Sequence, residues 1–199
     1  MTDPLMPQSD LPAWRKARRE DLLAARAALA QEARTGIAAA LADHVIALME
    51  ARGLMRPGLV FSGYWPIKSE PDLRPLMEAL AAKGLRLALP VVETRAAPLI
   101  FRPWSKGAAM ERGHWNILVP ATSAQVIPDI ALAPLVGWDR AGYRLGYGGG
   151  YFDRTLAALS PRPFVIGVGL QAAELETIHP QPHDIRLDAI VTEAGLQAG

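Results

Sequence analysis

Cysteine is absent from the 199 residues of this chain. Its absence excludes disulfides, thiolate-bound zinc, iron–sulfur clusters and a cysteine nucleophile. An excess of charge of one sign is also lacking, because 21 Lys and Arg balance 20 Asp and Glu and leave a formal net charge of +1. Proteins that bind nucleic acid chiefly by neutralising phosphates carry a clear positive excess. We therefore expect no nucleic-acid partner and only a local cationic site.

Long apolar runs are missing as well. Arg, Gln, Glu and Asp interrupt the Ala-rich segments, so no stretch approaches the roughly 18 residues of a membrane-spanning helix. Residues 1–12 lack the basic segment followed by an apolar run that marks a secretory signal. We expect a cytoplasmic protein with no membrane contact and no obligate protein partner. Residues 1–199 are expected to form a single domain, with residues 1–12 as a flexible end.

The order of predicted elements indicates the fold class. Asp10 and Pro12 precede a helix-forming run over 13–33, and a second helix is expected over 37–51, ended by Gly53. Further helices are expected over 72–83 and 151–159. Short apolar runs predict strands over 59–61, 85–89, 99–101, 130–136, 164–168 and 189–191. Apolar strands separated by helices predict an α/β fold: a mostly parallel sheet flanked by helices on both faces, with an N-terminal helical segment.

One glycine-rich segment lies between a predicted strand and a predicted helix. It runs Arg144-Leu145-Gly146-Tyr147-Gly148-Gly149-Gly150-Tyr151-Phe152-Asp153-Arg154. Glycines let backbone N–H groups approach an anion, and the N-terminus of the following helix favours negative charge. With Arg144 as a phosphate ligand and Asp153 as a ligand of Mg²⁺, the segment fits a nucleotide phosphate. The glycines alone also fit a sharp turn, and they match neither a Walker A loop nor an early dinucleotide fingerprint.

The first predicted helix has a basic face. At 100° per residue, Arg15, Arg19 and Arg26 lie within about 40° of one another, in a stripe shared with Leu22 and Leu29. Like charges at this spacing repel one another unless an anion or a carboxylate pairs with them. Two interpretations stay open: a phosphate clamp, or a surface helix whose arginines pair with acids of the protein.

Two histidines and two aspartates stand near the end of the chain. His179 and His183 have the spacing of a helical zinc pair, but the prolines around them prevent that helix, so no zinc site is expected. Asp184 and Asp188 precede a predicted strand, and either carboxylate could reach a magnesium ion. A loop cap is the commoner role of an isolated aspartate.

The glycine-rich segment, together with Glu111-x-Gly113-x-Trp115-x-Ile117-x-x-Pro120, resembles the 5-formyltetrahydrofolate cyclo-ligase family over about Arg15 to Glu193. The resemblance implies an α/β enzyme that uses ATP as co-substrate and Mg²⁺, with 5-formyltetrahydrofolate as its small-molecule substrate. In that family's reaction the γ-phosphoryl group of ATP moves to the formyl oxygen. N10 then attacks the formyl carbon and phosphate leaves, which gives 5,10-methenyltetrahydrofolate and ADP.

The resemblance also implies roles for particular residues. Folate binding falls on Tyr64, Trp65, Glu70 and Tyr151, and magnesium binding on Asp153 and Asp184. ATP binding falls on Arg15, Arg19, Arg144, Leu145, Gly146, Tyr147, Gly148, Gly149, Gly150, Tyr151 and Phe152.

Four positions depart from the family's pattern. Tyr147 stands where some members have Arg, Leu135 where Gly is usual, Val119 where an acid is common, and Arg15 where Lys is found. The change at Tyr147 removes one possible phosphate contact. An alternative function is therefore a non-catalytic nucleotide- or folate-binding regulator on the same fold, which would bind ATP without consuming it.

Overall fold

A computed structural model describes residues 9–199 of the chain. A flexible end was expected over residues 1–12. Residues 1–8 of it lie outside the described residues, and Leu11 and Pro12 already belong to a helix. The helices are α1 (Leu11–Ala27), α2 (Gln31–Ala51), α3 (Arg74–Ala82) and α4 (Tyr151–Ala158), with short 3₁₀ turns η1 (His114–Asn116) and η2 (Gln171–Ala173). The strands are β1 (Val60–Ser62), β2 (Arg86–Val91), β3 (Ile100–Trp104), β4 (Met110–Arg112), β5 (Leu118–Pro120), β6 (Ile130–Pro134), β7 (Gly137–Trp138), β8 (Arg144–Leu145), β9 (Phe164–Val168), β10 (Ala189–Thr192) and β11 (Gly195–Ala198).

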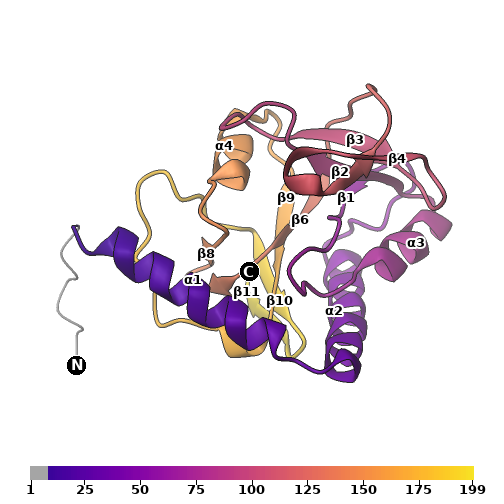
Figure 1. Cartoon of the computed structure of the whole chain (residues 1–199). Coiled ribbons are helices and arrows are strands. Elements are labelled where there is room, and N and C mark those ends of the chain that lie inside the picture. Colours follow the sequence, from indigo (N-terminus) through magenta and orange to yellow (C-terminus); the bar gives the residue numbers. More distant parts are fainter. Residues whose placement is uncertain (1–8) are drawn as a thin grey trace.

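A seven-stranded sheet forms the centre of the molecule, in the order β11-β10-β9-β6-β1-β2-β3 (Figure 1). The five inner strands pair in parallel, and β11 and β3 add antiparallel edges. The predicted α/β fold with a mostly parallel sheet is confirmed. Each predicted strand coincides with an observed one to within a few residues, and β9 has the predicted bounds.

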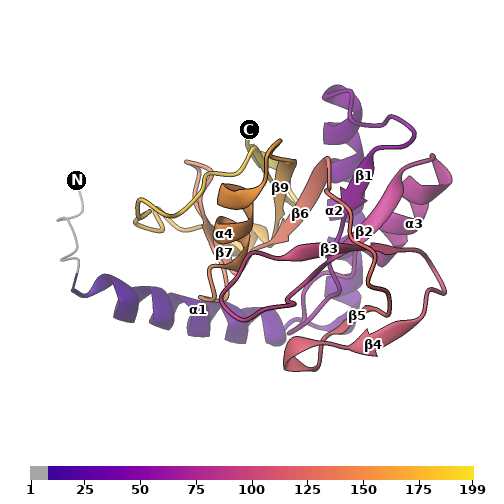
Figure 2. The same ribbon diagram turned by 90° about the horizontal axis from the view of Figure 1, so that it is seen from above.

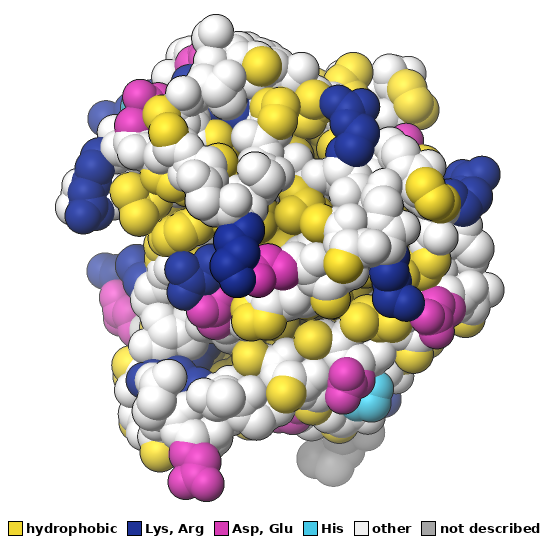
Figure 3. Space-filling model, turned by 90° about the vertical axis from the view of Figure 1, so that its right-hand side faces the viewer, with side chains coloured by type: hydrophobic (Ala, Val, Ile, Leu, Met, Phe, Trp, Pro, Cys, Tyr) yellow, Lys and Arg dark blue, Asp and Glu magenta, His cyan; other side chains and the backbone are white. Residues whose placement is uncertain are grey.

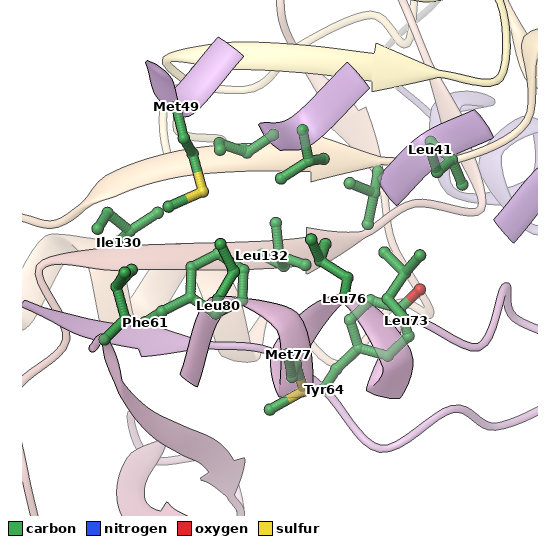
Figure 4. Packing of buried hydrophobic residues seen from close by; sticks show 14 of the residues in the cluster. Leu41, Met49, Phe61, Tyr64, Leu73, Leu76, Met77, Leu80, Ile130 and Leu132 are labelled. Carbon is green, nitrogen blue, oxygen red and sulfur yellow. The ribbon is translucent and has the colours of Figure 1, made fainter. Parts of the chain in front are cut away.

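Helices cover both faces of the sheet. Successive residues of a strand point to opposite faces, so the apolar side chains of an inner strand need helices on both sides to bury them. Leu132 of β6 packs with α2 and α3, and Figure 4 shows it among the side chains of those helices. The next residue, Ala133, packs on the other face with Leu156 of α4. Both inner faces are apolar, which explains why the inner strands have continuous apolar runs rather than alternating ones.

The chain leaves the sheet in opposite directions from β1 and β6, which are neighbours. From β1 the chain passes through α3 to β2 on one side, and from β6 it passes through α4 to β9 on the other. Loops that diverge in this way leave a crevice at the carboxyl ends of the two strands, where α/β proteins bind their ligands. The segments after Ser62 and Pro134 are therefore the expected walls of a site.

The N-terminal helices differ from the prediction at their junction. The first helix was expected to reach residue 33, but α1 ends at Ala27 and α2 already begins at Gln31. Alanine propensity gives no reason for a break, whereas tertiary packing does: α1 contacts β7 (Figure 2), and α2 contacts β10 and β11. Arg34 closes the turn by donating to the carbonyl of Leu29 at 3.1 Å.

Short hairpins and surface composition complete the architecture. The pairs β4–β5 and β7–β8 were not predicted, since strands of two or three residues are too short to show a period.

Among the described residues no helix is long and apolar enough to cross a membrane. On the described part of the face in Figure 3, Lys and Arg side chains lie interspersed with Asp and Glu rather than in one positive patch.

The core makes a direct prediction about stability. Leu132 is fully buried at the centre of the sheet, so Leu132→Ala leaves a cavity and should lower the free energy of unfolding by about 2–5 kcal/mol. Leu196→Ala is the matched control, because Leu196 is 52% exposed and its loss should cost less than about 0.5 kcal/mol. Urea unfolding of both variants measures the difference. Equal losses would contradict the burial assigned to Leu132.

Candidate functional site

A pocket of about 190 Å³ opens between α1 and the glycine loop, which we define as residues 146–150. Both segments lie at the crevice predicted by the sheet topology, since Pro134 at the end of β6 also lines the pocket. Its remaining walls bring together most of the side chains singled out in the sequence: Arg15, Arg19, Arg144, Leu145, Tyr151, Phe152, Asp153, His183 and Asp184.

The glycine loop adopts a backbone that other residues rarely accept. Gly148 has a φ of 92° and Gly150 a φ of 62°, both in the left-handed region. Gly150 is also the N-cap of α4, so the loop leads directly into the helix N-terminus. Within residues 9–199 nothing accepts a hydrogen bond from the amides of Gly148, Gly149 and Gly150. These free donors at a helix N-terminus are suited to an anion.

Arg15 and Arg19 of α1 lie on the opposite wall of the pocket. Arg15 forms an ion pair with Asp184, with 2.5 Å between Nη2 and Oδ2, and also donates to the carbonyls of Ile178 and His179. Arg19 donates through Nε to the carbonyl of Gly146 at 2.7 Å. Burial, and after it the neighbouring charge of Arg15, lowers the pKa of Arg19. A negative charge bound in the pocket would offset both effects, because it favours the charged form of Arg19.

Asp184 stays ionised because of its partners. Burial raises the pKa of this carboxyl, but the hydrogen bonds from Arg15 and from the amide of Gln181 outweigh burial, and the pKa lies below its ordinary value. Asp188 lies elsewhere: it accepts hydrogen bonds from the amide of Val165 and from Arg162, and it does not line the pocket.

Arg144 and Asp153 form a second buried pair at the pocket. Arg144 Nη2 lies 2.9 Å from Asp153 Oδ1, and the guanidinium stacks over the ring of Phe152. Asp153 Oδ1 also accepts a hydrogen bond from the amide of Ile185 at 3.0 Å. Arg144 therefore orients Asp153, and burial lowers the pKa of Arg144 despite the nearby carboxylate.

The donor set at the pocket suits one kind of metal site. No group of three or more His, Asp or Glu in the described part of the chain could hold a metal by itself. Mg²⁺, however, is commonly bound by one or two carboxylates together with substrate phosphates. Asp153 and Asp184 supply two carboxylates on one pocket, and Asp153 Oδ2 has no partner among residues 9–199. The residues therefore fit Mg²⁺ that arrives with a phosphate.

Glu70 lies beside a second cavity, of about 460 Å³, between α2 and the loop after β1. The side chain is nearly buried, and its Oε1 accepts a hydrogen bond from the hydroxyl of Tyr147 at 2.6 Å. Its Oε2 accepts one from the amide of Ile67 at 2.9 Å. Tyr147 thus belongs to the glycine loop by sequence, while its hydroxyl is bonded to Glu70.

The other predicted folate residues have different surroundings. Tyr64 is buried in the core and donates to the carbonyl of Pro71 at 2.7 Å, and Trp65 stacks under the guanidinium of Arg74. Neither lines the two cavities just described. Tyr151 lines the glycine-loop pocket, and its hydroxyl accepts a hydrogen bond from the amide of Ala96.

Two residues without an assigned role lie at the site. Trp115 is 65% exposed, has a φ of 52° and packs edge-on against Tyr151, with ring centroids 5.5 Å apart. The sequence did offer one signal for Trp115, namely its place in the motif Glu111-x-Gly113-x-Trp115. Arg26 is buried and donates to the hydroxyl of Tyr147 at 2.5 Å. The helical stripe placed Arg26 beside Arg15 and Arg19, but no local pattern indicated that Tyr147 is its partner.

Comparison with known proteins shows the family to which the chain is similar. The model of the 5-formyltetrahydrofolate cyclo-ligase family matches residues 12–193. A 5-formyltetrahydrofolate cyclo-ligase of Mycolicibacterium smegmatis is 34% identical over 148 residues, which are 70% of this chain and 76% of that protein. The Escherichia coli K12 cyclo-ligase is 32% identical over 62% of this chain and 71% of its own length.

A solved structure has the same fold. The NMR structure of the Aquifex aeolicus 5,10-methenyltetrahydrofolate synthetase superposes with a TM-score of 0.76 at 28% identity, over 92% of this chain and 91% of that one.

The ion pair between Arg15 and Asp184 makes a prediction about pH. At pH 7 Asp184→Asn should lower the free energy of unfolding by about 1–3 kcal/mol, because a charge-assisted hydrogen bond is lost. The pKa of Asp184 is lower in the folded protein than in the unfolded chain. Its contribution is therefore complete above the ordinary Asp pKa of about 3.9 and disappears as pH falls through the folded value.

Urea unfolding at pH 7 and near pH 3 tests this expectation. The stability difference between wild type and Asp184→Asn should shrink at the lower pH. Asp21→Asn, on the exposed side of α1, is the control and should change stability little at pH 7. A difference of the same size at both pH values would show that the charge of Asp184 does not stabilise the fold.

Proposed function

The chain belongs to the 5-formyltetrahydrofolate cyclo-ligase family and has its cyclo-ligase activity, and we propose that the glycine-loop pocket is the site where it binds the triphosphate of ATP. One observation carries this proposal. One pocket is lined by loop amides that have no partner within residues 9–199, by the N-terminus of α4, and by two arginines of α1 and two aspartates. This combination suits a polyphosphate better than it suits any other ligand of the reaction.

The chemistry requires that pocket to lie next to the folate. A formamide oxygen is a poor leaving group, so the formyl oxygen first takes the γ-phosphoryl group and ADP departs. N10 then attacks the formyl carbon and loses its proton, the C–O bond breaks, and inorganic phosphate leaves as the methenyl bridge closes. The protein needs no covalent nucleophile for these steps, only positioning and stabilisation of phosphate charge. The lack of cysteine is therefore no obstacle.

Arg19 is the arginine best placed to contact a phosphate. Only its Nε is bonded to another described residue, the carbonyl of Gly146, so both terminal nitrogens remain free to donate. Arg15 and Arg144 instead hold Asp184 and Asp153. In this proposal the two paired arginines keep the carboxylates oriented, and Arg19 neutralises transferring phosphate charge.

Asp153 and Asp184 are proposed to hold Mg²⁺ together with phosphate oxygens. When bound, the ion supplies positive charge that offsets the negative charge of the phosphates. Arg144 and the amide of Ile185 fix Asp153 Oδ1, which leaves Oδ2 available to the ion. Glu70, in the neighbouring cavity, is proposed to bind the folate through its carboxylate.

Absorbance of the methenyl product tests the function as a whole. Purified protein is mixed with 5-formyltetrahydrofolate and MgATP, and in parallel with magnesium but no ATP. The methenyl band should grow only when ATP is present. Binding of ATP without growth of the band would instead favour the regulator considered from the sequence.

The proposed contact between Arg19 and phosphate leads to a prediction about the KM for ATP. Arg19→Ala should raise the KM for ATP by about tenfold or more, because a charge-assisted contact with phosphate is lost. Arg18→Ala is the matched control: its side chain is on the same helix but points to solvent and pairs with Asp21. Steady-state rates at varied ATP measure both. Similar KM values for the two variants would refute the contact.

The role of Asp153 is tested by magnesium titration. Asp153→Asn keeps an acceptor for the amide of Ile185 but removes the negative charge, so half-maximal turnover should require about tenfold or more Mg²⁺. Asp188→Asn is the control, because Asp188 caps the backbone outside the pocket. Binding of Mg²⁺ with a non-hydrolysable ATP analogue, measured by calorimetry, supplies a readout independent of turnover. An unchanged magnesium requirement in Asp153→Asn would argue against this ligand.

A further inference from the structure

Three side chains from distant parts of the chain form one hydrogen-bonded series between the glycine loop and Glu70. Arg26 Nη2 of α1 donates to the hydroxyl of Tyr147 at 2.5 Å. That hydroxyl in turn donates to Glu70 Oε1 at 2.6 Å. None of these contacts is needed to explain phosphate binding. Tyr147, one of the four residues that depart from the family's pattern, is the middle member of the series.

Each member of the series is well fixed. Arg26 is 4% exposed and Glu70 is 7% exposed, so water competes little with their hydrogen bonds. The ring of Tyr147 also lies near two cations, with Lys68 Nζ 5.1 Å and the Arg26 guanidinium carbon 5.8 Å from its centroid. Burial and the nearby carboxylate of Glu70 raise the pKa of the Tyr147 hydroxyl, which therefore keeps its proton and donates.

Arg26 also fixes the backbone that carries Glu70. Its Nε donates to the carbonyl of Lys68 at 3.1 Å, and its Nη1 donates to the carbonyl of Leu135 at 3.2 Å. Lys68 and Ser69 both have positive φ values, 47° and 61°, which non-glycine residues adopt only when their surroundings hold them there. Arg26 thus restrains Glu70 twice, through this strained loop and through Tyr147.

The groups around Glu70 act on its charge in opposite directions. Burial raises the pKa of Glu70, while the hydrogen bonds from Tyr147 and the Ile67 amide, and the charges of Arg26 and Lys68, lower it. On the β1 side, the hydroxyl of Tyr64 is directed to the carbonyl of Pro71. Two further charged residues line the cavity beside Glu70: Arg34 of α2, and Asp72 in the segment just before α3.

We propose that Tyr147 and Arg26 are positioning residues for the folate: they hold the carboxylate of Glu70 in one orientation with its oxygens only partly occupied. The inference rests on the proposed function, in which Glu70 binds the folate. Among residues 9–199, Oε1 and Oε2 each accept one hydrogen bond, so each keeps a lone pair for an N–H group of the substrate. In this chain Tyr147 serves the folate side of the reaction rather than the phosphates.

Tyr147→Phe removes one hydroxyl and keeps the aromatic ring near Lys68 and Arg26. We expect the KM for 5-formyltetrahydrofolate to rise about tenfold or more, since a buried hydrogen bond to a charged group is lost. The KM for ATP should stay within about twofold of wild type. Tyr143→Phe is the matched control, because among the described residues the Tyr143 hydroxyl has no hydrogen-bond partner. A tenfold rise in the KM for ATP instead would overturn the proposal.

The pH profile separates positioning from simple loss of packing. Without the Tyr147 hydrogen bond the protonated form of Glu70 becomes more favourable, so the pKa of Glu70 should rise. The acidic limb of kcat/KM for the folate should therefore move to higher pH in Tyr147→Phe than in wild type or Tyr143→Phe. The ionisations of the substrate are common to all three proteins and cancel. An acidic limb at the wild-type position would contradict the proposal.

A double-mutant cycle with Glu70→Gln completes the test. If Tyr147 acts through Glu70, the double variant should bind folate no worse than Glu70→Gln alone. Additive effects would show that Tyr147 acts on the folate independently. If Glu70→Gln leaves the KM for folate unchanged, the assignment of Glu70 in the proposed function fails. If Glu70→Gln raises that KM and Tyr147→Phe does not, only the present inference fails.

Discussion

The buried charge of Arg26 is the constraint on which the arrangement of the site depends. No carboxylate is hydrogen-bonded to Arg26 directly in the described part of the chain. Its charge is satisfied by the carbonyls of Lys68 and Leu135 and by the hydroxyl of Tyr147, which is itself bonded to Glu70. Leaving a buried guanidinium unsatisfied costs several kcal/mol, so these segments have to meet around it. These are the segments after β1 and β6, where the chain leaves two neighbouring strands of the sheet in opposite directions.

This constraint gives α1 a role that its place outside the sheet does not suggest. One stripe of the helix presents Arg15 and Arg19 to the glycine-loop pocket and Arg26 to the loop that carries Glu70. The two cavities are therefore fixed relative to each other by a rigid element about two turns long between Arg19 and Arg26. A reaction that transfers a phosphoryl group between two bound molecules depends on such a fixed relation.

The sequence predicted the parts of this protein that depend on local patterns. The inner strands, α3, α4 and the glycine-rich turn all follow from apolar runs and punctuating glycines, and the stripe of Arg15, Arg19 and Arg26 follows from helical geometry. The hairpin β4–β5 and the edge strand β11 were not predicted, because strands of three or four residues are too short to show a period. The break after Ala27 was missed for another reason: packing against distant parts of the chain, not helix propensity, ends α1.

The direction of the Tyr147 side chain shows most clearly where a local pattern stops being informative. By position in the motif, Tyr147 belongs with the phosphate ligands, and the motif alone shows only that its phenol lacks a phosphate contact that arginine would make. Its partners, however, stand 121 residues earlier at Arg26 and 77 residues earlier at Glu70. A second cation beside Arg26 would add to a buried positive charge, whereas a phenol can accept from the guanidinium and donate to the carboxylate at once. The neutral hydroxyl is thus suited to the place between these two charges, and the departure from the pattern has a physical reason within this chain.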